Sequence, residues 1–321
     1  YLSIRSILQN DHSKWFKWLP HEGYVDGFAK VVNSWPSVLK LIIWSYGGEP
    51  LVPCMWEAPI VERSNEEQMP VILYSHGFGA SRFISATIGA ELASHGFLFA
   101  AIEHRENSAC ATYYYESQEK LEKKEETWIP HEKMLFGPDH YTIRNAQLHK
   151  RMTEFKRLIN LIEELNSGTA KNILPSNFDI SSLKDRLQTN SIHAMGHSFG
   201  GATSLLTMAH DKRLKSGTLL DSWMFPLKDE KLSVEQPLIF VNSQTFHIPT
   251  NLAIIEKYLQ EPAGSSHDVF TIRNTSHDLQ TDIPYIMGSW LNWFMRKLDS
   301  VIGTNINNHL ILRFYNQHIG P

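Results

Sequence analysis

Short apolar runs alternate with longer amphipathic stretches from about residue 70 onward. Runs rich in β-branched and aromatic residues are typical of buried strands, whereas apolar residues at three- and four-residue spacing are typical of helices. Six runs fit the strand pattern: Pro70–Tyr74, Phe97–Ile102, Ile192–Met195, Thr218–Leu220, Leu238–Asn242 and Val269–Ile272. The alternation predicts an α/β fold with a mainly parallel sheet and helices on both of its faces.

The amphipathic stretches between these runs predict the helices. One is expected over Phe83–Ser94, one from Phe199 onward, and a final one over about Pro284–Leu298. The longest carries an apolar stripe that we expect to face the core, made of Leu148, Met152, Phe155, Ile159, Ile162 and Leu165.

Residues 103–140 interrupt the alternation. They hold a tyrosine cluster at 113–115, a charged run at 119–126 and the segment Trp128-Ile129-Pro130, whose proline is typical of a break in regular structure. We therefore expect an excursion from the core that is partly loop. No repeat or Pro/Gly/Ser linker divides the sequence, and we therefore expect residues 1–321 to form one domain. Because the chain begins at Tyr1, without an initiator Met, we expect a fragment of a longer protein.

Composition excludes some classes of function. A net charge of −4 gives no basic footprint for nucleic acid. The longest apolar cluster, residues 38–44, is far too short to span a bilayer and contains a lysine. The two cysteines, Cys54 and Cys110, have no metal-ligand spacing and leave open both their pairing and the cellular compartment.

The pentapeptide Gly196-His197-Ser198-Phe199-Gly200 is the most informative motif. It lies between an apolar run and a stretch of helical character, which is the context of a nucleophile elbow. The flanking glycines allow a tight strand-to-helix turn that presents the serine Oγ outward. The motif predicts a serine hydrolase in which Ser198 is the nucleophile.

A serine nucleophile needs a histidine base and an acid that orients it. In proteins with this motif, the acid and then the histidine follow the serine along the chain. The later histidines are His210, His247, His267, His277, His309 and His318. We favour His277, which follows a predicted strand in a Thr-Ser-His-Asp turn, because such a position can reach over the elbow. His210 lies inside the helix after the elbow, and we expect His309 and His318 to lie in a tail beyond the last helix.

Asp221 is the candidate acid because it ends the predicted strand Thr218–Leu220. The turn after the next strand, residues 242–247, contains no carboxylate that could take the role instead. The alternative interpretation of Asp221 is a helix N-cap. We favour the catalytic role.

An oxyanion hole requires two backbone N–H donors. Phe199, directly after the nucleophile, supplies one candidate, and Phe78 in His76-Gly77-Phe78-Gly79 supplies the other because this turn resembles the glycine-rich turn of lipases and esterases. The alternative interpretation of the turn at Phe78 is an ordinary glycine-rich turn before a helix.

Beyond the elbow, the chain resembles the plasma and type II intracellular platelet-activating-factor acetylhydrolases, which have the α/β-hydrolase fold. Matching stretches cover residues 75–80, 92–97, 103–105, 111–114, 196–202 and 220–227. The last reads Leu-Asp-Ser-Trp-Met-Phe-Pro-Leu and is far more specific than the elbow, because general hydrolase chemistry does not require Trp-Met-Phe-Pro after the acid. The resemblance extends from about Trp18 to Leu298.

The resemblance implies Ser198, Asp221 and His277 as the triad and Phe78 and Phe199 as the oxyanion donors. It also implies hydrolysis of the short sn-2 acyl ester of platelet-activating factor and of oxidised phospholipids, with no metal or other cofactor. The chain departs from the family at Phe78, where leucine is usual, and at Ser222, where alanine is usual. The bulkier Phe78 ring is expected to narrow the acyl pocket. The chain also lacks the family's opening strands, so we expect an edge of the sheet to be missing.

A phospholipid substrate implies contact with a peripheral lipid or lipoprotein surface. Two stretches are candidates: Leu39, Ile42, Ile43 and Trp44 in the first, and Ile286, Met287, Trp290 and Leu291 in the second. Apolar and aromatic residues with nearby basic residues suit an interfacial helix. The alternative is that both stretches pack on the protein itself.

Two other functions stay open. One is a carboxylesterase or lipase of broad specificity, and the other is a catalytically inactive hydrolase-fold binding protein, which the complete set of Ser198, Asp221 and His277 argues against. The sequon Asn274-Thr275-Ser276 abuts His277, where a glycan would crowd the site, and we expect it to be unused.

Overall fold

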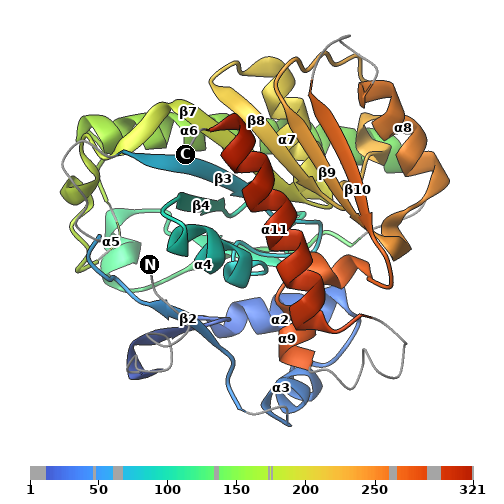
Figure 1. Cartoon of the computed structure of the whole chain (residues 1–321). Coiled ribbons are helices and arrows are strands. Elements are labelled where there is room, and N and C mark those ends of the chain that lie inside the picture. The colour runs from blue at the N-terminus through green and yellow to red at the C-terminus, as the bar shows by residue number, and fades with distance from the viewer. Residues whose placement is uncertain are drawn as a thin grey trace.

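A six-stranded parallel sheet lies at the centre of the computed structural model (Figure 1). The structure describes residues 12–45, 48–60, 68–133, 137–172, 174, 176–259, 266–287 and 298–319. The strands follow the order β10-β9-β8-β7-β3-β4. Their bounds are β3 (Met69–Ser75), β4 (Leu98–Ile102), β7 (Leu187–His197), β8 (Leu214–Leu220), β9 (Leu238–Ser243) and β10 (His267–Ile272). The predicted parallel α/β sheet is confirmed.

Strand β7 is longer than its apolar run suggested. Its eleven residues begin at Leu187, five residues before the predicted start at Ile192. Its first half is partly exposed and carries polar side chains at residues 188–191, so no continuous apolar pattern marks it. Both neighbours show an irregularity in their pairing with β7 near Ile192.

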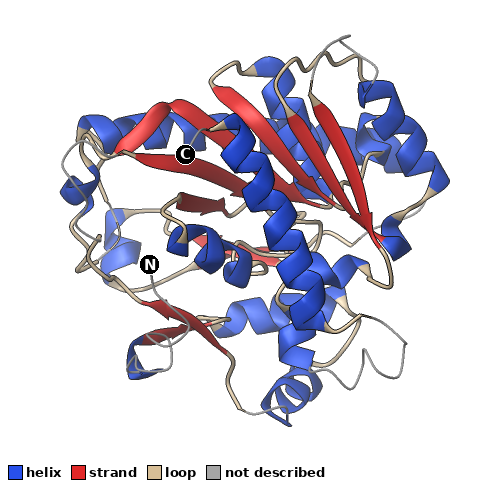
Figure 2. Cartoon of the chain, viewed as in Figure 1, coloured by secondary structure: helices blue, strands red, loops and turns tan. Residues whose placement is uncertain are grey.

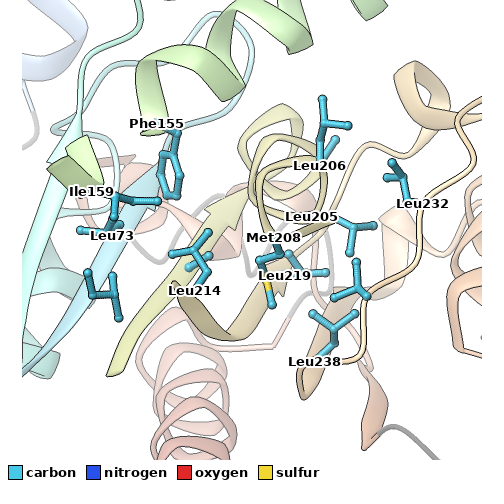
Figure 3. Close-up of a cluster of buried hydrophobic side chains, with 14 of the residues drawn as sticks. Leu73, Phe155, Ile159, Leu205, Leu206, Met208, Leu214, Leu219, Leu232 and Leu238 are labelled. Carbon is cyan, nitrogen blue, oxygen red and sulfur yellow. The ribbon is translucent and has the colours of Figure 1, made fainter. Parts of the chain in front are cut away.

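Side chains alternate between the two faces of the sheet, as the pleat of a strand requires. On one face, Val71 and Leu73 pack with buried residues of α6 (His140–Ser167), α7 (Phe199–His210) and α8 (Pro249–Leu259), a cluster that Figure 3 shows in part. On the other face, Ile72 and Tyr74 pack with α4 (Ala86–Ser94) and α11 (Ser300–His318). Figure 2 shows helices on both sides of the strands. The apolar stripe predicted for the longest helix lies on α6 and faces the core.

The excursion at 103–140 contains a small antiparallel sheet. Strands β5 (Ala111–Tyr114) and β6 (Thr127–Pro130) pair with each other, and α5 (Gln118–Glu122) lies in the connection. Near the chain start, β1 (Trp15–Lys17) pairs with β2 (Leu51–Met55), with α2 (Glu22–Val31) and α3 (Pro36–Ser45) between them. The short 3₁₀ turns are η1 (His12–Lys14), η2 (Ile180–Leu183), η3 (Phe225–Leu227), η4 (Gln244–Phe246) and η5 (His277–Gln280).

The C-terminal prediction was wrong. Helix α9 covers Ile283–Met287, residues 288–297 lie outside the described residues, and α11 then runs from Ser300 to His318. The segment Pro284–Leu298 therefore does not hold the last helix, and His309 and His318 lie on α11 rather than in a tail. Gly303 and several asparagines are poor helix formers, so the sequence pattern did not predict α11. Packing of Ile311, Phe314 and Tyr315 against the sheet stabilises it instead.

Smaller differences concern helix starts and covalent links. Helix α4 begins at Ala86 instead of Phe83, because residues 82–85 form turns. Both cysteines are free, Cys110 being buried and Cys54 half-buried. Within the described ranges, no helix combines the length and apolar character needed to cross a membrane.

Candidate active site

Ser198 occupies a strained turn between β7 and α7. Its φ of +57° lies in the left-handed region, which few non-glycine residues adopt, and such strain is common at functional sites. A Cβ on Gly196 would collide with the Gly200 carbonyl, so the turn requires glycine there. Ser198 N donates to Leu220 O at 2.9 Å, which fixes the elbow against the end of β8.

Asp221 directly follows β8 and is fully buried. Its Oδ1 accepts from Ser243 N at 2.5 Å, and its Oδ2 accepts from Ser243 Oγ at 2.7 Å. His277 Nδ1 lies 3.0 Å from the same Oδ2. Since a carboxylate only accepts, the imidazole donates from Nδ1 and its Nε2 is left to act as a base. Asp221 therefore contacts the predicted base and is not simply a helix cap.

His277 lies at the start of η5, just after β10, and its side chain is 38% exposed. Its ring stacks on Phe246 with centroids 4.2 Å apart, and the His197 ring lies 4.4 Å away on a tilt. Burial, with the nearby His277, holds the pKa of His197 well below its ordinary value. His197 thus stays neutral beside the base. Among the described residues, no hydrogen bond joins Ser198 Oγ to His277, and such bonds are often loose without substrate.

The loop after β3 approaches the elbow closely. A Cβ on Gly77 would lie 3.2 Å from Ser198 Cβ and 3.3 Å from His197 Nδ1, so only glycine fits comfortably. In the part of the chain that the structure describes, the backbone N–H groups of Phe78 and Phe199 take no part in turn or loop hydrogen bonds. Both amides are thus available as hydrogen-bond donors near the serine.

The side chains of Phe78 and Phe199 belong to an aromatic cluster. The Phe78 ring lies 6.2 Å from both the Phe199 and the Trp223 rings, and Phe199 and Trp223 are 5.5 Å apart. Trp223 N donates to Ser198 O at 2.9 Å, and this bond holds the segment after Asp221 against the elbow. Asn251 holds residues 222–224 in place: its Nδ2 donates to Ser222 O and its Oδ1 accepts from Met224 N, both at 2.7 Å.

Sequence reasoning gave no role to several groups that shape the site. Ser243 stands in the very turn that lacked a carboxylate, yet it bonds the carboxylate of Asp221. Phe246 follows in the same turn and stacks on the base. No periodic or motif signal marks these residues, because their partners are distant in sequence.

His197, Asp221 and His277 also form a group that could hold a metal ion, with ligand atoms within 4.8 Å of one another. Asp221 Oδ2 and His277 Nδ1 are hydrogen-bonded to each other. A metal bound through these two atoms would break the contact that orients the imidazole. We therefore interpret Asp221 and His277 as an acid–base pair and not as metal ligands.

The two candidate lipid-contact stretches differ in exposure. Helix α3 buries no residue, but its most exposed apolar side chains are Trp35 beside its start (78%), Trp44 (69%) and Leu41 (62%). Leu39, Ile42 and Ile43, which we had singled out, are only half-exposed. In the second stretch, Ile286 is half-buried and packs in a cluster with Trp18 and Ile84. Met287 ends α9, and Trp290 and Leu291 lie outside the described residues.

Comparisons with known proteins match a family model and several relatives over most of the chain. The family model described as "Platelet-activating factor acetylhydrolase, isoform II" matches residues 4–320. Platelet-activating factor acetylhydrolase of Canis lupus familiaris is 35% identical over 317 residues, covering 97% of this chain and 70% of that protein. The Gallus gallus protein of the same name is 32% identical, covering 94% and 74%. A putative phospholipase A2 of Schizosaccharomyces pombe is 26% identical, covering 84% and 71%.

A solved structure extends the likeness to the fold. Ferulic acid esterase from Streptomyces cinnamoneus superposes with a TM-score of 0.57 at 16% identity, covering 79% of this chain and 68% of that one. The parallel sheet, the strand-turn-helix at Ser198 and this likeness show that the chain has the α/β-hydrolase fold. More narrowly, it belongs to the platelet-activating factor acetylhydrolase isoform II family.

Proposed function

We propose that this chain is a serine esterase that hydrolyses the short sn-2 acyl ester of platelet-activating factor and of oxidised phospholipids. The observation that carries the proposal is the pairing of His277 with the buried Asp221 beside a strained Ser198. Membership in the acetylhydrolase family supports the choice of a phospholipid ester.

The reaction would follow two acyl-transfer steps. Ser198 Oγ attacks the sn-2 carbonyl carbon while His277 Nε2 takes its proton, and Asp221 stabilises the resulting imidazolium through Nδ1. The Phe78 and Phe199 amides donate to the oxyanion. The imidazolium then protonates the leaving lysophospholipid oxygen. In the second step His277 deprotonates a water that attacks the acyl-serine carbonyl, and it returns this proton to Ser198 Oγ as the short carboxylic acid leaves.

The aromatic cluster supports a short acyl group. Phe78, Phe199 and Trp223 crowd the position beside the proposed oxyanion donors. A long acyl chain would have to displace rings from this space, whereas an acetyl group would not. One methylene in such a pocket is worth about 1–3 kcal/mol of discrimination.

We propose further that α3 contacts the lipid surface. Its exposed tryptophans and Leu41 present large apolar side chains to solvent, and Lys40 on the same helix is also exposed. Tryptophan and a basic neighbour are the residues that favour the headgroup region of a membrane.

Side-by-side rates on an sn-2 acetyl and an sn-2 palmitoyl phosphatidylcholine test the substrate. We expect the acetyl ester to be hydrolysed at least about a hundredfold faster, with no change on adding a chelator. Equal rates would favour a lipase or carboxylesterase of broad specificity. The absence of any hydrolysis by folded protein would favour a binding protein.

A further inference from the structure

A fully buried arginine lies beneath the loop that carries Phe78. Arg151 projects from α6, its side chain is 0% exposed, and Nη1 donates to His76 O at 2.6 Å. Nη2 faces Gly77 O at 3.5 Å and donates to Ser108 Oγ at 2.5 Å. Nε donates to Glu106 and to Ser108 Oγ. The guanidinium thus connects α6, the loop after β3 and the segment after β4.

Two of these contacts fall on the peptide groups that lead to the proposed oxyanion donor. The C=O of Gly77 and the N–H of Phe78 belong to one planar peptide and point in opposite directions. A donor held on the carbonyl therefore sets the direction of the N–H. The carbonyl also accepts from His76 Nδ1 at 2.9 Å and from Ala80 N at 3.3 Å, so Arg151 is one of three groups that hold it. Positive charge at the oxygen polarises the peptide and strengthens the N–H as a donor.

The same guanidinium contacts the second proposed donor. Arg151 Cζ lies 4.6 Å from the centroid of the Phe199 ring, within range of a cation–π interaction. Arg151 therefore contacts the carbonyl of the peptide that carries the Phe78 N–H and the ring of Phe199, the residue that carries the second amide. Its charge is paired with Glu106, and although burial raises the pKa of that carboxyl, Arg151 and His104 hold it below its ordinary value.

The need for stability does not by itself explain this arrangement. A buried ion pair is often replaced by apolar residues of similar volume with no loss of stability. Arginine offers a planar fork of five donors, which here reaches two carbonyls, a hydroxyl and a carboxylate, whereas lysine has a single nitrogen. The fit between the guanidinium donors of Arg151 and the acceptors around the loop after β3 indicates that this side chain sets the geometry of the loop.

We propose that Arg151 is a positioning residue for the oxyanion hole, holding the Gly77–Phe78 peptide and the Phe199 ring in the arrangement that transition-state binding requires. The inference rests on the proposed function, because it needs Ser198 to be acylated. Arg151 lies on the carbonyl side of the loop and acts through Phe78 without touching the substrate.

The test is the double variant Arg151→Met/Glu106→Gln, which removes both charges of the pair, beside Arg151→Lys, which keeps the positive charge. With a soluble acetyl ester we expect the double variant to lose about a hundredfold in kcat with KM nearly unchanged, and the lysine variant to lose less. The rate of fluorophosphonate labelling at Ser198 is expected to fall in parallel. Guanidinium ion added to Arg151→Ala is expected to restore more of kcat than methylammonium does.

Ile159→Ala is the matched control. Ile159 is buried on the same helix and packs in the core, so its loss costs about 2–5 kcal/mol of stability without touching the loop. We expect its kcat to be unchanged. A wild-type kcat in folded Arg151→Lys and in the double variant, or an equal loss in Ile159→Ala, would overturn the inference. A wild-type protein that neither hydrolyses the ester nor labels at Ser198 would instead overturn the proposed function.

Discussion

The Nδ1 atom of His277 lies 3.0 Å from Oδ2 of Asp221, a carboxylate that is completely buried. The two residues are held by separate parts of the chain, one after β8 and one after β10. Ser243, at the end of β9 between them, bonds both carboxylate oxygens. The pair is therefore oriented by three neighbouring strand ends, and this arrangement leads to the first prediction.

Asp221→Asn is expected to lower kcat by about 10³–10⁴-fold with little change in KM. With its oxygen toward Ser243 N, the amide would turn its NH₂ toward His277 Nδ1 and favour the tautomer that cannot take the serine proton. Steady-state kinetics on a soluble acetyl ester measures the loss. Ser243→Ala is the control, since it removes one bond and keeps the carboxylate, and about a tenfold loss is expected. An asparagine variant as active as Ser243→Ala would refute the role of Asp221.

Phe78→Leu is expected to extend the range of accepted acyl chains. The substitution keeps the backbone N–H and removes an aromatic ring that lies 6.2 Å from Phe199 and Trp223. The ratio of kcat/KM for a hexanoyl ester to that for an acetyl ester should rise about tenfold. Phe225→Leu is the control: it removes a ring that stacks on Trp223 and, within the described part of the chain, makes no ring contact with Phe78 or Phe199, so the ratio should stay near that of the wild type. Unchanged ratios in both variants would show that Phe78 does not limit the chain.

The double variant Trp35→Ala/Trp44→Ala is expected to bind vesicles of anionic phospholipid at least about tenfold more weakly. Both side chains are largely exposed, so their loss should not alter hydrolysis of a soluble ester. Sedimentation with vesicles measures the binding. Leu161→Ala, which removes an exposed apolar side chain from α6, should bind as the wild type does. Equal binding by all three proteins would place the lipid contact elsewhere.

The sequence was a good guide to the sheet and to the central residues of the site. Strands buried on both faces are continuous apolar runs, and the elbow has a fixed local pattern, so both could be recognised without partners. The carboxyl ends of parallel strands lie at one edge, which is why Asp221 and His277 could be paired before any distance was known. The structure shows the contact between Asp221 and His277, and their catalytic roles stay predictions.

The remainder could not be predicted from local pattern. Helix α11 contains Gly303 and several asparagines, and it is stabilised by contacts with the sheet that only the fold creates. Ser243 and Arg151 carry no motif, and each contacts a partner far away in sequence. On α3, an apolar cluster was visible, but which of its side chains face solvent depends on how the helix packs.

Acid stability provides a prediction away from the site. Burial, with the nearby His318, lowers the pKa of His193 from 6.5 to about 4. Between these values the unfolded state binds more protons than the folded state, so this stability is present above pH 6.5 and is lost as the pH falls toward 4. We expect the wild type to lose about 3 kcal/mol of unfolding free energy over this range relative to His193→Gln. Urea unfolding of both proteins from pH 7 to pH 4 measures it, and a pH-independent difference would contradict it.

The most direct test of the account follows Ser198 and activity in the same sample. The protein is titrated with a fluorophosphonate, the labelled peptide is identified by mass spectrometry, and the remaining hydrolysis of an sn-2 acetyl phospholipid is measured. We predict one label per chain, on Ser198, with activity lost in proportion to labelling and no label on Ser198→Ala. Full labelling of Ser198 with hydrolysis intact, or loss of activity through a label on another residue, would contradict the account.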